Sequence, residues 1–284
     1  MSTRTIACLG SAALLWLALL GIARAAPAAA DHVGEVPALQ VVTLNLYHDK
    51  DDWPARRVQI VRELQRLQAD VIALQEVIEN DRVPNQARWL AEQLGYRWYF
   101  ASTDAPGSRT RYGNAMLTRH RILARGQKRL RPMDDSRTAA FLRIDLQGHP
   151  VNVYVTHLHW TEDGGAIRKV QVDDLAEYLD ATSGKVPSLV AGDFNAAADA
   201  PELGPLRRHF GDAWSSLRPD LDGIEGSTLN PAYHPPRRID HVFFQGEAFR
   251  PLSATLLFEH PDERGIWASD HRGVLVSLGF AAAD

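Results

Sequence analysis

Cysteine is nearly absent from this sequence of 284 residues, since the only one is Cys8. It lies in an apolar segment near the N-terminus, so removal of that segment would leave no cysteine. Such a chain has no disulfide, no thiolate nucleophile and no cysteine-ligated zinc, even in an oxidising compartment. Excess positive charge is absent too: the formal net charge is −4, and it becomes −6 without Arg4 and Arg24. A general electrostatic attraction to nucleic acid is therefore excluded, whereas a local basic groove is not.

Long apolar runs are also missing, with one exception at the N-terminus. Residues 6–22 form an almost wholly apolar run of 17 residues, and Ala23-Arg24-Ala25 then fits the small-x-small rule for signal cleavage. An uncleaved anchor is the alternative, but such a run is at the lower limit for a membrane span. Cys8 lies too early in the run for a lipoprotein site. We predict a signal peptide over residues 1–25 and a secreted or periplasmic protein without stable membrane insertion.

After a short extension over residues 26–37, the chain predicts one α/β domain over residues 38–280, because strand and helix patterns alternate without a Pro/Ser-rich linker. Apolar runs predict strands over residues 39–46, 69–76, 98–101, 113–118, 141–146, 151–157, 189–192, 238–244, 251–258 and 274–278. Stripes at helical spacing predict helices after Pro54, over about 85–94 and after Gly164-Gly165. Residues 103–111 should form a polar loop, and residues 199–237 should form an irregular region. The arginines of the first helix, Arg56 among them, should lie on a solvated face.

The stretch Leu189-Val190-Ala191-Gly192-Asp193-Phe194-Asn195 shows how polar groups follow a buried strand. Gly192 allows a close approach of backbone or ligand, and Asp193 and Asn195 would share one face of an extended chain. Other predicted strands end in the same way, and each such residue alone has an ordinary structural explanation. Together they indicate one site, whose members are Asn45, Glu76, His157, Asp193, Asn195, Asp240, Asp270 and His271.

This set of side chains suits hydrolysis assisted by a hard cation. Carboxylate and amide oxygens are the ligands of Mg²⁺ or Mn²⁺, which keep several waters and take further ligands from a phosphate. Zinc is less suited to a chain without cysteine ligands and with scattered histidines.

Seven motifs in order resemble the endonuclease/exonuclease/phosphatase superfamily, the deoxyribonuclease-I-like fold, and in particular a secreted bacterial-type member. They are Thr43-Leu44-Asn45, Leu74-Gln75-Glu76, Tyr112-Gly113-Asn114-Ala115, Thr156-His157-Leu158, Gly192-Asp193-Phe194-Asn195, Arg238-Ile239-Asp240 and Ser269-Asp270-His271. The resemblance covers nearly all of the chain after the signal peptide. It implies a four-layer αββα sandwich, in which two mostly antiparallel sheets pack face to face with helices outside.

The resemblance also implies roles for the site. Glu76 would be the principal metal ligand, supported by Asn45 and Asp270. Asp193 and Asn195 would position the attacking water and the phosphate, and His157 would hydrogen-bond a phosphate oxygen. Asp240 would hold His271, which would act as base or would stabilise charge. Asp193 and the His271–Asp240 pair are both candidates for the general base, and a need for neutral His271 would make activity fall below about pH 6, near the ordinary histidine pKa.

Further candidates for contacts with substrate or phosphate are Asn114, Arg137, His159 and Trp160. Arg137 is either a phosphate-binding or a surface arginine, and Trp160 either stacks on a base or packs under its loop. Arg168 and Gln171 are expected to be structural. One departure from the family pattern is Arg272-Gly273, where proline is usual, and it could loosen the local backbone.

Substrate choice in this superfamily depends on loops, which the sequence describes least well. We expect a nuclease, narrowly ahead of a phosphodiesterase or phosphatase of lipid (sphingomyelinase-like) or small-molecule esters. A non-catalytic binding protein on the same scaffold is the alternative of another class, although none of the eight site positions has been lost. The protein is expected to be a monomer.

Overall fold

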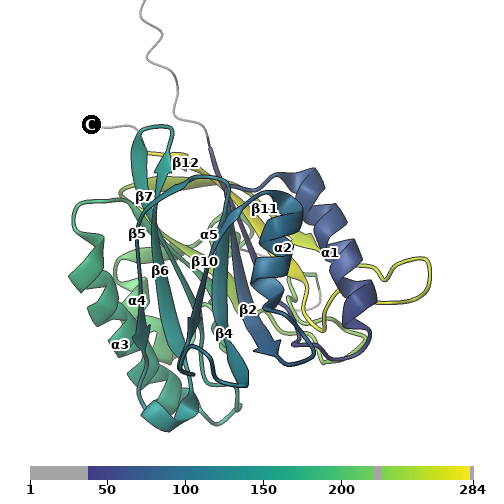
Figure 1. Ribbon diagram of the computed structural model, residues 1–284. Helices are drawn as coiled ribbons and strands as arrows, with labels where there is room; N and C mark the ends of the chain where they lie inside the picture. The colour runs from purple at the N-terminus through teal and green to yellow at the C-terminus, as the bar shows by residue number, and fades with distance from the viewer. Residues whose placement is uncertain (1–37, 220–224, 282–284) are drawn as a thin grey trace, which may run out of the picture. The chain divides into compact units, whose positions relative to one another are not determined.

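The computed structural model describes residues 38–219 and 225–281, so the expected signal peptide, the extension and Cys8 lie outside the described residues. Within these described residues, twelve strands form two sheets of six, and Figure 1 shows the sheets with the helices around them. The first sheet contains, in spatial order, β11 (Phe249–Leu257), β12 (Gly273–Phe280), β1 (Leu39–Asn45), β2 (Val71–Asn80), β4 (Thr110–Thr118) and β3 (Arg97–Ser102). The second contains β5 (Arg121–Arg129), β6 (Thr138–Leu146), β7 (His149–His157), β8 (Ser188–Asp193), β10 (Asp240–Gln245) and β9 (Phe210–Asp212).

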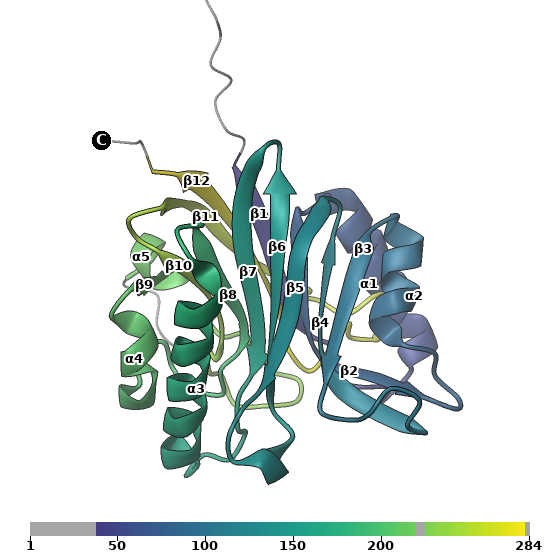
Figure 2. The same ribbon diagram turned by 60° about the vertical axis from the view of Figure 1, so that its left-hand side comes forward.

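Each sheet has one parallel pair, β1–β2 in the first and β7–β8 in the second, and its other pairs are antiparallel. Helices α1 (Trp53–Leu67) and α2 (Gln86–Leu94) pack on the first sheet, and α3 (Gly165–Ser183) packs on the second with α4 (Gly204–Arg207) beside it. Figure 2 shows these two helix pairs on opposite sides of the strands. The expected four-layer sandwich is confirmed.

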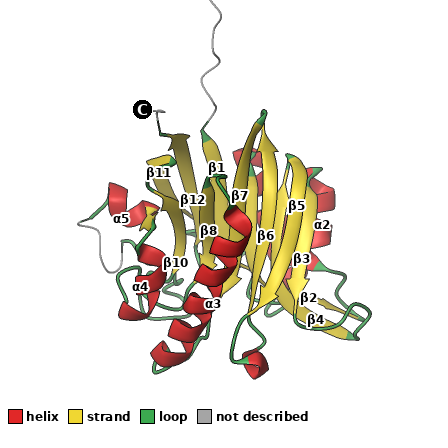
Figure 3. Ribbon diagram, turned by 90° about the vertical axis from the view of Figure 1, so that its left-hand side faces the viewer, coloured by secondary structure: helices red, strands yellow, loops and turns green. Residues whose placement is uncertain are grey.

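Side-chain alternation along the strands builds the four layers. Val41 of β1 faces the core between the sheets, whereas Val42 faces the core under α1 and α2. In β8, Leu189 faces the core between the sheets and Val190 faces α3. Strands covered on both faces lose the hydrophobic–polar alternation of exposed sheets, which explains the continuous apolar runs in the sequence. Figure 3 shows α3 in front of β7 and β8.

Several element boundaries differ from the sequence-based expectation. The region 199–237 is not irregular throughout, because it contains the 3-10 turn Pro201–Leu203, α4, β9 and α5 (Ala213–Leu217). These elements have three to five residues each, too few to show a period. The polar loop ends earlier than expected, since β4 begins at Thr110, and the edge strand β5 was not predicted because its polar sequence resembles a loop.

Arg56 does not lie on a solvated face, and this corrects the expectation for α1. Its side chain is fully buried and donates hydrogen bonds to the carbonyl oxygens of Leu46, Tyr47, His48, Lys50 and Ala268. One guanidinium therefore joins the loop after β1 to the segment before β12. Among the described residues, no helix is both long enough and apolar enough to cross a membrane.

Candidate active site

Strand pairing brings polar residues at strand ends of both sheets close together. The parallel register of β1 and β2 pairs Asn45 with Gln75, the residue before Glu76. In the second sheet, Asp193 pairs with His157 on one side and with Asp240 on the other. Asn45 Nδ2 donates to Asp193 Oδ2 at 3.1 Å, so a buried hydrogen bond connects the two sheets at this point.

A buried triad occupies the second-sheet side of the site. His271 Nδ1 lies 2.8 Å from Asp240 Oδ2, and His271 Nε2 lies 3.9 Å from Asp193 Oδ2. His157 approaches the same oxygen of Asp193 from β7, with Nε2 at 3.5 Å. The orienting contact between Asp240 and His271 that the sequence resemblance implied is therefore present.

Burial and neighbouring charge act in opposite directions on this triad. Burial and the charge of Asp240 raise the pKa of Asp193 to about 7. Burial alone would lower the pKa of His271, but the charge and hydrogen bond of Asp240 outweigh it and raise that pKa. His271 is thus protonated at neutral pH, and the pKa of His157 is held well below its usual value by burial and by Arg137.

Gly192 allows this packing. A Cβ at this position would collide with the carbonyl oxygen of Thr156 on β7. The close approach that the sequence suggested is therefore an approach of backbone, and it brings the ends of β7 and β8 together.

The position of the Glu76 side chain is set by an irregularity within β2, because Glu76 does not lie at the end of the strand. The strand continues to Asn80, and the pairing register with β4 shifts between Leu74 and Val77. Glu76 has a positive φ of 56°, which is uncommon for a residue other than glycine. His48 Nε2 lies 3.0 Å from Glu76 Oε2. Burial would raise the pKa of Glu76, but the hydrogen bond with His48 and the charge of nearby imidazoles lower it to about 2.

Asp270 is held on the other side of the same site. Its Oδ2 lies 3.0 Å from His234 Nε2, and the preceding Ser269 donates to the carbonyl oxygen of Asn45 at 2.7 Å. The Arg272-Gly273 departure leaves no loose backbone, because the amide of Arg272 donates to the carbonyl oxygen of Thr228 and Gly273 begins β12.

Asn195 does not share an extended face with Asp193, and the expectation for this pair was wrong. Its φ of 51° turns the chain, its backbone amide donates to Asp193 Oδ1, and its side-chain amide donates to the carbonyl oxygen of Leu158. Asn195 thus holds the segment after His157 against the strand end that carries Asp193.

Of the further candidates, Asn114 and Arg137 are buried. Asn114 donates to the backbone and side-chain oxygens of Thr138, which joins β4 to β6. Arg137 is only 7% exposed, so it is not a surface arginine. Its guanidinium donates to the hydroxyl of Tyr112, which in turn lies 3.2 Å from His157 Nδ1. This chain of contacts leads from Arg137 to the triad.

His159 and Trp160 differ in how much of each side chain remains available for contacts with a substrate. Both ring nitrogens of His159 have partners, Asp135 and Thr161. Trp160 does not pack under its loop, because it is 68% exposed. Arg168 holds the carbonyl oxygens on both sides of Trp160, those of His159 and Thr161.

Gln171 completes the support of this loop. Its side chain accepts from the amide of His159 and donates to Asp135. Arg168 and Gln171 are both buried, so the contacts agree with the structural role expected for them. The loop backbone is fixed while the indole of Trp160 is displayed to solvent.

Three residues at the site were missed by the sequence analysis: His48, Tyr112 and His234. His48 lies three positions after Asn45 and Tyr112 begins a quoted motif, so proximity to strand-end motifs was an available signal. His234 had no such signal, because it lies in the region 199–237, whose path is set by tertiary contacts.

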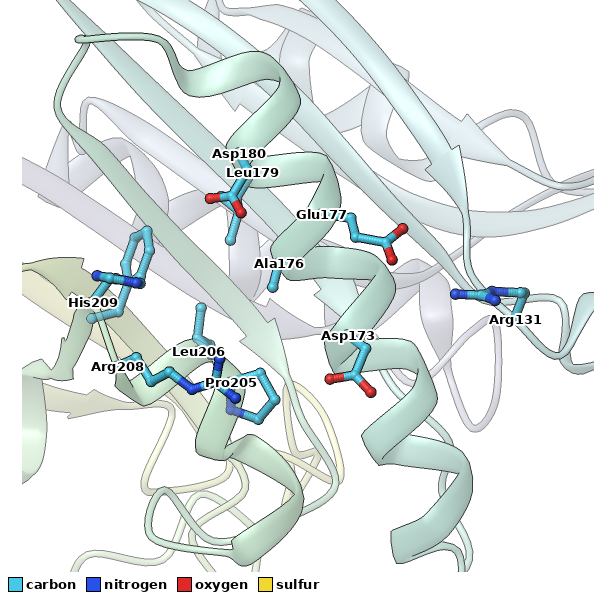
Figure 4. A pocket seen from close by; sticks show the side chains of 11 residues that line it. Arg131, Asp173, Ala176, Glu177, Leu179, Asp180, Pro205, Leu206, Arg208 and His209 are labelled. Atoms are coloured by element: carbon cyan, nitrogen blue, oxygen red, sulfur yellow. The ribbon is translucent and has the colours of Figure 1, made fainter.

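A separate hollow of about 400 Å³ lies between α3 and α4 (Figure 4). It is lined by acidic side chains of α3, such as Asp173 and Asp180, and by Arg208 and His209 beyond α4. None of the candidate site residues lines it.

The family model described as the endonuclease/exonuclease/phosphatase family matches residues 42–271. The chain belongs to this family. Endonucleases, exonucleases and phosphatases hydrolyse phosphoester bonds, and the matched range includes all eight residues of the site predicted from the sequence. The sequence resemblance to the family is confirmed.

Solved structures show the same fold at low sequence identity. The human Nocturnin catalytic domain with bound sulfate has a TM-score of 0.71 and 23% identity, covering 86% of this chain and 94% of that one. D. rerio TDP2 complexed with a single-stranded DNA product has a TM-score of 0.73 and 16% identity, covering 85% and 99%. Protein angel of Drosophila melanogaster is 25% identical over an alignment of 198 residues that covers 63% of this chain and 56% of that protein. This chain therefore matches little more than half the length of that relative.

Proposed function

We propose that this protein is an exported, divalent-metal-dependent phosphodiesterase that cleaves nucleic acid. The carrying observation is that Glu76 and Asp270 lie close enough to His271 for the charges to affect one another's pKa. His271 belongs to the buried Asp193–Asp240–His271 triad, which a hydrogen bond from Asn45 joins to the other sheet. Membership of a family named for phosphoester hydrolysis supports the reaction class. The presence of all eight polar residues that the sequence resemblance implies argues against a binding protein without activity.

The donor set fits a hard cation. Glu76 has a pKa of about 2 and is fully ionised at neutral pH, and with Asp270 and Asn45 it offers oxygen ligands of the kind that Mg²⁺ or Mn²⁺ takes. When bound, such a cation supplies Lewis-acid stabilisation of charge on phosphate oxygens. Asp193, Asp240 and His271 have ligand atoms within 4.8 Å of one another, close enough to share a metal ion. We nevertheless assign them to proton transfer, because His271 Nδ1 is engaged with Asp240.

The triad supports an assignment of the base that the sequence left open. Asp240 keeps His271 protonated, so His271 suits stabilisation of negative charge better than removal of a proton. Asp193 has a pKa near neutrality, which suits a base that accepts the proton of the attacking water. His157 and Arg137, joined through Tyr112, would face a phosphate oxygen. Asn195 would act through the backbone that it orders.

Nucleic acid is favoured as substrate by Trp160. Its exposed indole lies on the loop after His157, whose backbone Arg168 and Gln171 hold in place. Nucleic-acid bases of any sequence can stack on such an aromatic surface. The complex of D. rerio TDP2 with a single-stranded DNA product shows that this fold can hold such a strand. A lipid or small-molecule phosphoester remains the competing substrate class.

We further propose that residues 1–25 are a signal peptide, that residues 26–37 form an extension, and that the monomeric domain of residues 38–280 works outside the cytoplasm. The apolar run and cleavage pattern of the N-terminus support export. Recovery of the processed protein from periplasm or medium, with its N-terminus determined, tests this.

The decisive assay uses residues 26–284 with Mg²⁺, Mn²⁺ or EDTA. Single- and double-stranded DNA, RNA, bis-p-nitrophenyl phosphate, p-nitrophenyl phosphate and sphingomyelin are offered in parallel. We expect cleavage of a nucleic acid that EDTA abolishes. Metal-dependent turnover of only a small ester or only sphingomyelin would replace the proposed substrate, and no turnover by folded protein would contradict the enzyme.

Glu76→Gln tests the metal assignment. Loss of a charged ligand should reduce metal-dependent hydrolysis by about 10²-fold or more, while circular dichroism shows an unchanged fold. Retained activity in the purified variant would overturn the assignment. His271→Ala serves as a second variant that should lose activity without losing metal binding.

A further inference from the structure

His48 and Glu76 form a hydrogen bond in this structure, and the same spacing of their two atoms also suits two ligands on one cation. Two ligand atoms that lie about 2.1 Å from a metal, at right angles about it, are about 3 Å apart. His48 Nε2 and Glu76 Oε2 are 3.0 Å apart. Asp270, the other carboxylate proposed to bind the metal, has a histidine at the same spacing, His234 at 3.0 Å.

The loop that carries His48 is fixed in an uncommon conformation. Tyr47 and His48 both have positive φ, 56° and 51°. Gln86 Nε2 donates to the carbonyl oxygen of His48 at 2.7 Å, and buried Arg56 donates to those of Tyr47 and His48. The backbone is thus held from behind while the imidazole points to Glu76, and about a third of its side-chain surface is exposed.

We propose that His48 is a metal ligand alongside Glu76, which makes this a mixed imidazole–carboxylate site. The inference rests on the metal role of Glu76 proposed above. Imidazole nitrogen suits first-row transition metals, whereas Mg²⁺ takes oxygen ligands. Mn²⁺ is the transition metal that carboxylate and water oxygens also suit, so it tolerates a mixed ligand set better than Mg²⁺ does. His48 therefore gives the protein a preference for Mn²⁺ over Mg²⁺.

Metal binding, not activity, provides the test. Isothermal titration calorimetry of the wild-type protein with each metal should show that Mn²⁺ binds at least about tenfold more tightly than Mg²⁺. His48→Gln, whose amide still reaches Glu76 as a donor, should lose about tenfold in Mn²⁺ affinity and much less in Mg²⁺ affinity. His149→Gln is the control, because His149 is exposed at the opposite end of β7 and should change neither affinity.

Pulsed EPR of bound Mn²⁺ gives an independent measurement. Coupling to a directly bound imidazole ¹⁴N is expected in the wild type and in His149→Gln, and it should weaken in His48→Gln. Equal losses of Mn²⁺ and Mg²⁺ affinity in His48→Gln would overturn the inference, as would unchanged Mn²⁺ binding or a wild type without ¹⁴N coupling. Each of those outcomes leaves the proposed metal enzyme intact, whereas wild-type protein that binds neither metal would contradict both.

Discussion

At the scale of single residues, the site is a balance of buried charges. Asp193, Asp240 and His271 are each at most 7% exposed, so each responds strongly to its neighbours' charges. The expectation that activity depends on neutral His271 does not fit this environment, because the ion pair with Asp240 holds its proton through the neutral range. The residue that titrates near neutrality is Asp193.

The decrease of activity at low pH should therefore result from protonation of Asp193. As a base it must be ionised, so kcat should fall as pH decreases through its pKa, which burial and Asp240 raise to about 7 in the metal-free protein and which a bound cation lowers. Replacement of Asp240 by Asn removes the negative charge that raises this pKa, and it also weakens the hold on the His271 proton, whose charge lowers the pKa. Because the effect of Asp240 is the larger of the two, the acid limb of the pH profile should move to lower pH, with a lower maximal rate. The measurement is kcat for bis-p-nitrophenyl phosphate between about pH 5 and 9 at saturating metal. A limb at the same pH in both proteins would contradict the assignment.

Trp160 is the residue for which exposure itself is informative. Trp160→Ala should raise KM for single-stranded nucleic acid by about 5- to 150-fold, because stacking on an aromatic side chain is worth about 1–3 kcal/mol per base. Steady-state kinetics on an oligonucleotide measure it. Trp98→Ala is the matched control, since Trp98 is 36% exposed at the far end of its sheet. Equal effects of the two substitutions would argue against a stacking role.

At the scale of elements, α1 contributes more than a hydrophobic face. Through Arg56 it ties the loop after β1 to the backbone before Asp270. Arg56→Lys retains the charge but not the planar set of five donors, so several buried carbonyl groups lose their partner. We expect a loss of about 2–4 kcal/mol in unfolding free energy, measured by chemical denaturation. Arg62→Lys on the exposed side of α1 should change it by less than about 0.5 kcal/mol, and similar losses in both variants would refute the role of Arg56.

The elements also show which information the sequence contains. Strands with a buried face, such as β1 and β8, could be predicted because apolar residues mark them, and the motifs at their ends located Asn45 and Asp193. The buried state of Arg56 could not, because its partners are carbonyl groups from residues 46 and 268 that only the folded chain brings together. The edge strand β5 was missed for a related reason: its residues pair through backbone and leave a polar pattern.

At the scale of the whole molecule, the site is a junction between the two sheets. The first sheet supplies Asn45 and Glu76, and the second supplies Asp193 and Asp240. With Asp270, the site contains four acidic side chains, which repel one another when ionised. The side chain of Asn45 donates a hydrogen bond to Asp193 across the junction. A cation bound there would offset the repulsion and join the two layers.

Metal should consequently stabilise the entire domain against unfolding. A ligand present at about 100 times its Kd adds about 2.7 kcal/mol, and for a domain of this size that corresponds to a rise in Tm of about 5–10 °C. We expect this shift when Mn²⁺ replaces EDTA in differential scanning calorimetry of the wild type. Glu76→Gln should lose most of the shift, whereas His149→Gln should keep it. An equal shift in Glu76→Gln would mean that the cation stabilises the protein elsewhere, and the junction would not be its binding site.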